Sequence, residues 1–181
     1  MCGRFYIEPD APSFAEMLTE MSRFDAPVKA HGEIFPTDIA AVRTERGFSP
    51  MKWGFSGFDG KPVINARSET AREKPMFRDS MARRRCLIPA SGYFEWQKSG
   101  SRKVKYRFYT PDAPLLLAGC WREDAGATCG ASFVILTRDA VGGAETIHDR
   151  MPVMVPWGDA DAWFAGGVAE FDAARLVWET A

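Results

Sequence analysis

Cys2, in the opening residues MCGRF, can carry two nucleophiles on adjacent carbon atoms. Methionine aminopeptidases remove Met1 when residue 2 is small, and the processed chain would begin with a cysteine that has both a thiol and a free α-amine. Their ordinary pKa values are about 8.5 and about 8, so both groups are accessible near neutral pH. The amine condenses with an aldehyde to an imine, and the thiol can close onto that imine as a five-membered thiazolidine. Small residues also occur at position 2 without any chemical role, so this feature alone leaves both interpretations open.

Two further residues stand where acid–base chemistry is possible. His148 precedes an apolar stretch in IHDRMPVMV, where a histidine can act as a general acid or base or can simply cap the surface. Glu95 stands between two aromatic residues in GYFEW. If its side chain points inward, loss of hydration would raise its pKa, whereas strand alternation alone explains an outward position. We assign no role to His31.

The segment INARSET offers polar side chains at every second position. In an extended chain Asn65, Arg67 and Glu69 share one face. An asparagine can hold a nucleophile through a neutral hydrogen bond, and an arginine presents a fork that suits phosphate. A polar turn that leads into a helix is the alternative interpretation. Arg4 lies two residues from Cys2, so a phosphate bound there would bring a nucleic-acid backbone close to the nucleophile.

The composition excludes several classes of protein. The net charge of the 181 residues is −1, so a nucleic-acid site has to be a local patch rather than a global field. The four cysteines show no CxxC spacing, which predicts neither a zinc site nor a disulfide framework. The longest apolar run, from Ala113 to Trp121, is far short of the roughly 18 residues of a membrane helix. We find no secretory signal and predict a cytoplasmic protein without cofactor or metal.

Many short strands and few helices are expected along the chain. The hydrophobic pattern predicts strands at 3–7, 39–44, 49–55, 85–97, 104–110, 115–121, 132–137 and 151–155, and helices at 14–21, 76–84 and 159–164. The regular alternation of strand and helix that marks a doubly wound parallel sheet is absent. The sequence therefore predicts an α+β fold with mostly antiparallel sheets, in one domain over residues 1–181.

Five segments together resemble the SOS-response-associated peptidase (SRAP) family. They are MCGRF, KWGF (52–55), INARSET (64–70), RRRCLIPASGYFEW (83–96) and the pair TRDA and IHDRMPVMV within 137–155. They occur in the order found in the family and span nearly the whole chain. The resemblance implies curved, mostly antiparallel sheets around a barrel-like core with a few flanking helices. It also implies a protein that recognises abasic sites in single-stranded DNA and links to them covalently through the N-terminal cysteine. Such a protein is expected to be monomeric, associated with the nucleoid when bound to DNA, and not bound to a membrane.

The resemblance further implies a role for each matching residue. Cys2 would be the nucleophile, Asn65 would position its amine or thiol, Glu95 would assist proton transfer, and His148 would act as acid or base on the sugar. The implied DNA contacts are phosphate contacts by Arg4, Arg67 and Arg150, a hydroxyl contact by Thr137, a stacking or wedging surface of Trp53 and Pro36, and packing by Trp96 beneath the site.

This chain departs from the family pattern in one segment, and two other functions stay open. The segment WGFSGFDGKPVINAR is short and contains Phe55 and Phe58 where relatives often have a second tryptophan. GEIFPTD keeps only the Pro-Thr of a more typical motif, which weakens the assignment of Pro36. One alternative function is a peptidase or amidohydrolase that uses Cys2, including one that only processes its own N-terminus. The other is a non-catalytic module that binds single-stranded DNA.

Overall fold

A computed structural model describes residues 2–10, 12–100, 102–168 and 171–181 of the chain. The strands are β1 (Phe5–Ile7), β2 (Gly32–Ile34), β3 (Ile39–Thr44), β4 (Gly47–Trp53), β5 (Phe55–Ser56), β6 (Pro62–Val63), β7 (Asn65–Arg67), β8 (Arg85–Ala90), β9 (Gly92–Ser99), β10 (Arg102–Tyr109), β11 (Leu115–Glu123), β12 (Ala131–Asp139), β13 (Arg150–Pro152), β14 (Met154–Val155) and β15 (Val177–Thr180). The α-helices are α1 (Ala15–Met21), α2 (Arg78–Arg83) and α3 (Ala160–Phe164), and single 3-10 turns lie at Pro12–Phe14, Ala144–Thr146, Trp157–Asp159 and Ala173–Arg175.

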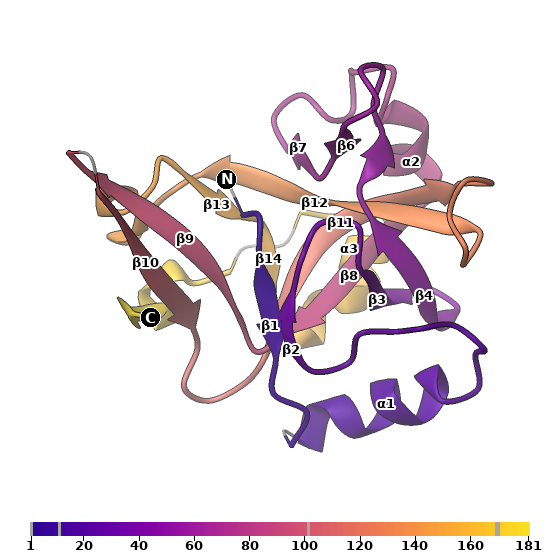
Figure 1. Ribbon diagram of the computed structural model, residues 1–181, viewed down its shortest axis with the longest axis horizontal. Helices are drawn as coiled ribbons and strands as arrows, with labels where there is room; N and C mark the ends of the chain where they lie inside the picture. Colours follow the sequence, from indigo (N-terminus) through magenta and orange to yellow (C-terminus); the bar gives the residue numbers. More distant parts are fainter. Residues whose placement is uncertain (1, 11, 101, 169–170) are drawn as a thin grey trace.

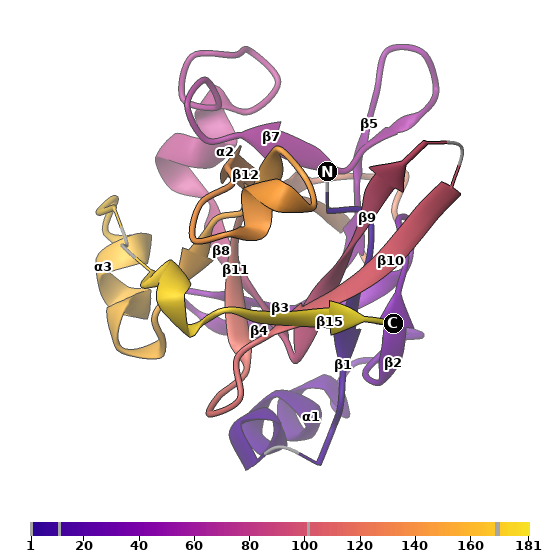
Figure 2. The same cartoon turned by 90° about the vertical axis from the view of Figure 1, so that its left-hand side faces the viewer.

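Strands β12, β4, β3, β8 and β11 pair in a closed ring and form the barrel of the protein. The pair β4–β12 is parallel and the other four pairs are antiparallel. Figure 2 shows these strands arranged around a common centre. Closure of the ring removes the free sheet edges that would otherwise expose unpaired backbone groups.

Apolar residues cover both faces of the barrel strands. All six residues of β8 are buried, and so are the first six of β11. Such continuous apolar runs are typical of strands that are covered on both sides. One core cluster, which includes Phe5, Trp53 and Phe133, fills the inside of the barrel. A second cluster lies where α2 and α3 pack on the outer side of β8 and β11.

A second sheet, in the order β15-β10-β9-β1-β2, brings the N-terminal segment to the long hairpin β9–β10 (Figure 1). Strand β1 is antiparallel to β9, with Phe5 opposite Tyr93. One step further, the backbone N–H of Phe94 donates to the carbonyl of Arg4 at 2.9 Å. This register carries Cys2 toward the part of β9 that holds Glu95.

The predicted α+β class with a mostly antiparallel, barrel-like core is confirmed. Several element boundaries were wrong. The strand expected at 85–97 is two strands, because the chain leaves the barrel sheet near Ser91 and β9 pairs with β1 and β10 instead. The strand expected at 151–155 likewise splits into β13 and β14, which pair with different strands. The strand expected at 49–55 breaks at Gly54, which has a positive φ of 114°. Strands β2 and β15 were not predicted.

None of the helices among the described residues has both the length and the apolar character that a bilayer crossing requires.

Gly92, the first residue of β9, is tightly enclosed by the neighbouring strands β1 and β10. A Cβ atom there would collide with the backbone oxygen of Phe108 on β10 and would lie 2.6 Å from the ring of Tyr6 on β1. We expect Gly92→Ala to destabilise the protein by about 1–3 kcal/mol, because the backbone of β10 and the ring of Tyr6 must both move. Gly158→Ala is the control, since nothing lies within 4 Å of its Cβ position. Urea unfolding of both variants measures the difference, and equal midpoints would show that β9 has room to shift.

Candidate active site

Cys2 is fully buried, and neighbouring strands hold its backbone in place. The side-chain N–H of Asn65, on β7, donates to the carbonyl oxygen of Cys2 at 2.8 Å. The thiol points to the carbonyl of Arg4 at a distance of 3.8 Å. Because β7 pairs in parallel with β12, the barrel itself fixes Asn65. Met1 lies outside the described residues.

Glu95 lies on the inner face of β9, with only 3% of its surface exposed. Burial raises its pKa above the ordinary value for a carboxyl group. Burial, followed by the charge of Glu95, also raises the pKa of the Cys2 thiol well above its usual range. The inward orientation of Glu95 that the sequence left open is thereby established. At neutral pH the site therefore favours a neutral thiol next to a carboxyl group that can exchange a proton.

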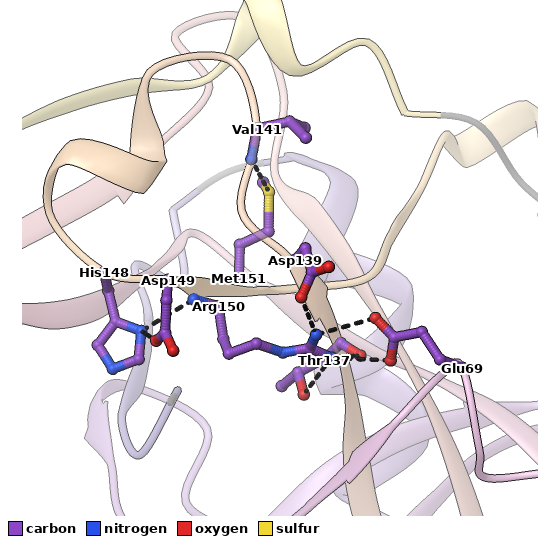
Figure 3. Close-up of polar contacts among 8 residues, drawn as sticks. All are labelled: Glu69, Thr137, Asp139, Val141, His148, Asp149, Arg150 and Met151. Carbon is purple, nitrogen blue, oxygen red and sulfur yellow. Dashed lines mark hydrogen bonds and ion pairs between the residues drawn. The ribbon is translucent and has the colours of Figure 1, made fainter.

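His148 faces Glu95 from the loop before β13, with 4.0 Å between its Nε2 atom and Oε2 of Glu95. Its other ring nitrogen, Nδ1, has two neighbours (Figure 3). The backbone N–H of Arg150 donates to Nδ1 at 3.0 Å, and Oδ1 of Asp149 lies 2.8 Å from the same atom. A neutral Nδ1 accepts from Arg150, whereas a protonated Nδ1 donates to Asp149. The loop therefore offers Nδ1 both a donor and an acceptor, while Nε2 faces Glu95.

Arg150 forms a buried clamp between carboxylates, which does not fit the expected contact with phosphate. Only 7% of its side chain is exposed, and it binds both oxygens of Glu69 at 2.9 Å (Figure 3). Asp139 and the carbonyl of Thr137 accept further hydrogen bonds from the same guanidinium. The hydrogen bonds from Arg150 to Glu69 lower the pKa of Glu69 to about 2. Thr137 is itself fully buried, so its hydroxyl group is not accessible to DNA either.

Trp53 lies inside the barrel, and the expected stacking surface for bases is therefore wrong for this residue. Its side chain is fully buried, with ring centres 5.2 Å from Phe5 and 6.3 Å from Phe133. Its indole N–H donates to the carbonyl of Ile64 at 3.0 Å. The alternation of β4 turns this position inward, and the sequence alone did not fix which face of the strand would meet the core.

The remaining predicted contacts lie at the surface. Arg67 is exposed at the end of β7, and Pro36 is half-buried. The Arg4 guanidinium lies 4.3 Å from the ring centre of Phe35 and 5.0 Å from that of Trp96, and it pairs with Glu33 at 2.8 Å. Trp96 thus packs on Arg4, and it also lines the cavity beside Glu95 and His148.

Two further residues stand out in the structure and had been given no role. Phe58 is fully exposed in the loop between β5 and β6. Tyr93 lies two residues before Glu95 on the same face of β9 and is 1% exposed. The alternation of GYFEW could have indicated Tyr93, because residues at i and i+2 of a strand share a face. For Phe58 the signal was its place in the short segment after Trp53, where relatives often have a second tryptophan.

A cavity of about 540 Å³ opens beside the cluster, lined by Glu95, Trp96, His148, Lys98, Lys103 and their neighbours. Its lining carries two lysines and, besides Glu95, the exposed carboxylate of Asp149. Across the described ranges, no three His, Cys, Asp or Glu side chains gather as a set of metal ligands. The groups present at this site thus support nucleophilic and acid–base chemistry.

Relatives with this fold occur in several organisms. The chain is 29% identical to the abasic site processing protein YedK of Escherichia coli, over 98% of this chain and 85% of that protein. It is 27% identical to the abasic site processing protein HMCES of Xenopus tropicalis, over 93% of this chain and 59% of that protein. A crystal structure of a Bordetella bronchiseptica protein matches with a TM-score of 0.74 and 25% identity, over 99% of both chains.

A Bacteroides thetaiotaomicron protein shares the fold with a TM-score of 0.78 at 20% identity, over 99% of this chain and 91% of that one. The family description "SOS response associated peptidase (SRAP)" matches residues 1–179. The chain belongs to the SOS response associated peptidase (SRAP) family.

Proposed function

We propose that this protein processes abasic sites in single-stranded DNA by linking to them covalently through Cys2. The observation that carries the proposal is that Asn65, Glu95 and His148, from three further segments, gather beside the buried Cys2. Membership of the family and the names of the relatives from E. coli and Xenopus support the substrate class.

The reaction begins once Met1 has been removed and the α-amine of Cys2 is free. The amine attacks C1′ of the open-chain sugar aldehyde, and loss of water gives an imine. The thiol then adds to the imine carbon, the π-electron pair moves to nitrogen, and nitrogen takes up a proton to complete the thiazolidine. Holding amine, thiol and aldehyde in one pocket makes a slow bimolecular condensation effectively intramolecular.

Each neighbour of Cys2 has a distinct part in this scheme. Asn65 holds the carbonyl of Cys2, and its Oδ1 atom is buried without a hydrogen-bond partner among the described residues, so it offers an acceptor to the amine. Glu95, whose pKa burial raises, takes a proton from the amine and returns it to the leaving water. His148 promotes opening of the sugar ring to the aldehyde.

DNA approaches over the exposed residues around the site. Arg67, Arg4 and the lysines Lys98 and Lys103 supply positive charge for phosphates, which makes the affinity depend on salt. Phe58, Pro36 and Trp96 supply the surface for bases, and Phe58 takes over the stacking role that Trp53 cannot fill.

The second candidate function is a peptidase that uses Cys2 as its nucleophile, because the family description names that activity. Nucleophilic attack on an amide needs a thiolate. Burial and Glu95 both disfavour the thiolate of Cys2, so repeated turnover of amide substrates is disfavoured in this site. Removal of residues ahead of Cys2 in the same chain is compatible with the proposal.

Substitution of Cys2 separates covalent chemistry from simple binding. We expect the wild-type protein, mixed with single-stranded DNA that carries one abasic site, to give a slow-migrating band on a denaturing gel. Cys2→Ser should bind the DNA in native gels yet lose this band. Cys2→Ala keeps the amine and should give only an adduct that needs cyanoborohydride to survive. Cys129→Ser changes a half-buried thiol elsewhere and should behave as wild type.

Intact mass measurement of the same samples shows whether Met1 is absent. Absence of the band from wild-type protein that lacks Met1 would overturn the crosslinking proposal. Retention of the band by Cys2→Ser would assign the nucleophile to another residue.

Glu95→Gln tests the proton transfer. We expect crosslinking to slow by about 100-fold or more at neutral pH, because a positioned acid–base group contributes about 10²–10⁴-fold. In the wild-type protein the rate should rise with pH across a range above the ordinary carboxyl pKa, because burial raises the pKa of Glu95. The Cys2 thiol and the Tyr93 hydroxyl lie near this carboxyl and stay neutral over that range, because burial raises both pKa values, and His148 faces it from the loop before β13.

Stability provides the check on folding for this variant. The pKa of Glu95 is higher in the folded state than in the unfolded state, because burial disfavours the charged form. The folded state therefore loses stability as the pH rises through that range and the carboxyl group ionises. Glu95→Gln should therefore be at least as stable as wild type at neutral pH. Glu16→Gln, an exposed residue of α1, is the matched control. An unchanged rate and pH profile in Glu95→Gln would remove Glu95 from the mechanism.

Phe58→Ala tests the surface proposed for bases. Stacking of a base on an aromatic ring contributes about 1–3 kcal/mol, so affinity for single-stranded DNA should fall by about 5- to 150-fold. The fold should not change, because the side chain is fully exposed. Phe24→Ala removes another exposed aromatic ring and serves as control in fluorescence anisotropy titrations. Equal affinity of both variants would place the DNA away from this loop.

A further inference from the structure

The hydroxyl group of Tyr93, a residue on the same strand as Glu95, is buried without a hydrogen-bond partner among the described residues. The tyrosine ring is held firmly, because it stacks on Phe108 with a centre distance of 4.8 Å and an angle of 7° between the planes. A buried hydroxyl without a partner costs about 1–3 kcal/mol. Such a group in a folded protein calls for a reason, and a catalytic role is one of the recognised reasons.

Tyr93 shares its surroundings with two reactive residues, Cys2 and Glu95. Tyr93 shares the inner face of β9 with Glu95 and belongs to the same buried cluster as Cys2. The pKa of Tyr93 is raised well above its ordinary value, first by burial and then by the charges of Cys2 and Glu95. The hydroxyl therefore stays neutral and can donate one hydrogen bond while it accepts others.

Closure of the thiazolidine ring poses a problem that such a group solves. The proton of the thiol must leave sulfur, and a proton must reach nitrogen, while Cys2 has no contact with bulk water. A thiolate is disfavoured here because burial and Glu95 raise the pKa of the thiol. The two proton movements are therefore best coupled through a neutral group that does both at once.

We propose that Tyr93 is a catalytic residue of the ring-closing step, in which its hydroxyl relays the proton from the Cys2 thiol to the imine nitrogen. This inference rests on the proposed function. The S–C1′ bond forms while the π bond of the imine breaks toward nitrogen. Nitrogen takes the proton of the tyrosine hydroxyl, and the tyrosine oxygen takes the proton of the thiol. Tyr93 ends the step as it began, so no further reactant is needed.

Tyr93→Phe isolates this step, because the two adducts respond differently to cyanoborohydride. The reagent reduces an imine to a stable amine and leaves a thiazolidine unchanged. In time courses with abasic single-stranded DNA, we expect Tyr93→Phe to form total reductant-trapped adduct at the wild-type rate. The adduct that survives denaturation without reductant should form at least about tenfold more slowly, as expected for loss of an acid–base group.

The variant keeps the ring that stacks on Phe108 and removes only the unpartnered hydroxyl, so its urea midpoint should not fall below that of wild type. Tyr109→Phe, on β10, removes a hydroxyl outside the cluster and is the matched control. An unchanged ratio of the two adducts in Tyr93→Phe would overturn the relay, and so would an equal loss of both adducts. If the proposed function itself is wrong, the wild-type protein gives neither adduct. That result would exclude the relay as well.

Discussion

The hydrogen bond from Asn65 to the carbonyl of Cys2 is the constraint on which the rest of the site depends. A chain terminus normally frays, because little holds it to the domain. Here the carbonyl of Cys2 is bound by β7, and the carbonyl of Arg4 is bound by the N–H of Phe94 on β9. The N-terminal segment is thereby fixed between the barrel and the second sheet. Cys2, the proposed nucleophile, thereby gains the rigidity of a core residue.

Burial of Cys2 sets the chemistry that the site can perform. Loss of hydration raises the pKa of the thiol, of Glu95 and of Tyr93, so the neutral form of each group is favoured. An enzyme that relies on thiolate attack needs the opposite environment, with positive charge next to the sulfur. A site of neutral donors and acceptors suits condensation with an aldehyde, in which protons are passed along and no stable charge develops.

The sequence predicted strands well where the pattern extended over many residues. Strands β10, β11 and β12 were found because alternation or continuous burial runs through eight or nine residues of each. Strands β2 and β15 have three and four residues, and their pairing depends on partners far along the chain. A pattern within one short segment carries no information about such partners.

The same limit explains which site residues were placed correctly. The inward position of Glu95 and the burial of Trp53 both depend on which face of a strand meets the core, and alternation alone gives two equal solutions. One carboxylate partner of Arg150 is Glu69, which stands 81 residues earlier in the chain. Only the fold reveals that the guanidinium is already bound, and so only the fold separates Arg150 from the exposed Arg67.

This division between bound and exposed arginines limits how the protein can attract DNA. A buried guanidinium is stable only when carboxylates and carbonyls satisfy it, so the charge of Arg150 is cancelled within the protein by Glu69 and Asp139. Arg4 is partly cancelled in the same way by Glu33, which also pairs with Lys105. With a net charge of −1, little attraction remains beyond the cations at the rim of the site. Weak, salt-dependent contacts would then bring the strand to the site, and the covalent bond to Cys2, rather than electrostatic affinity, would determine how long it stays.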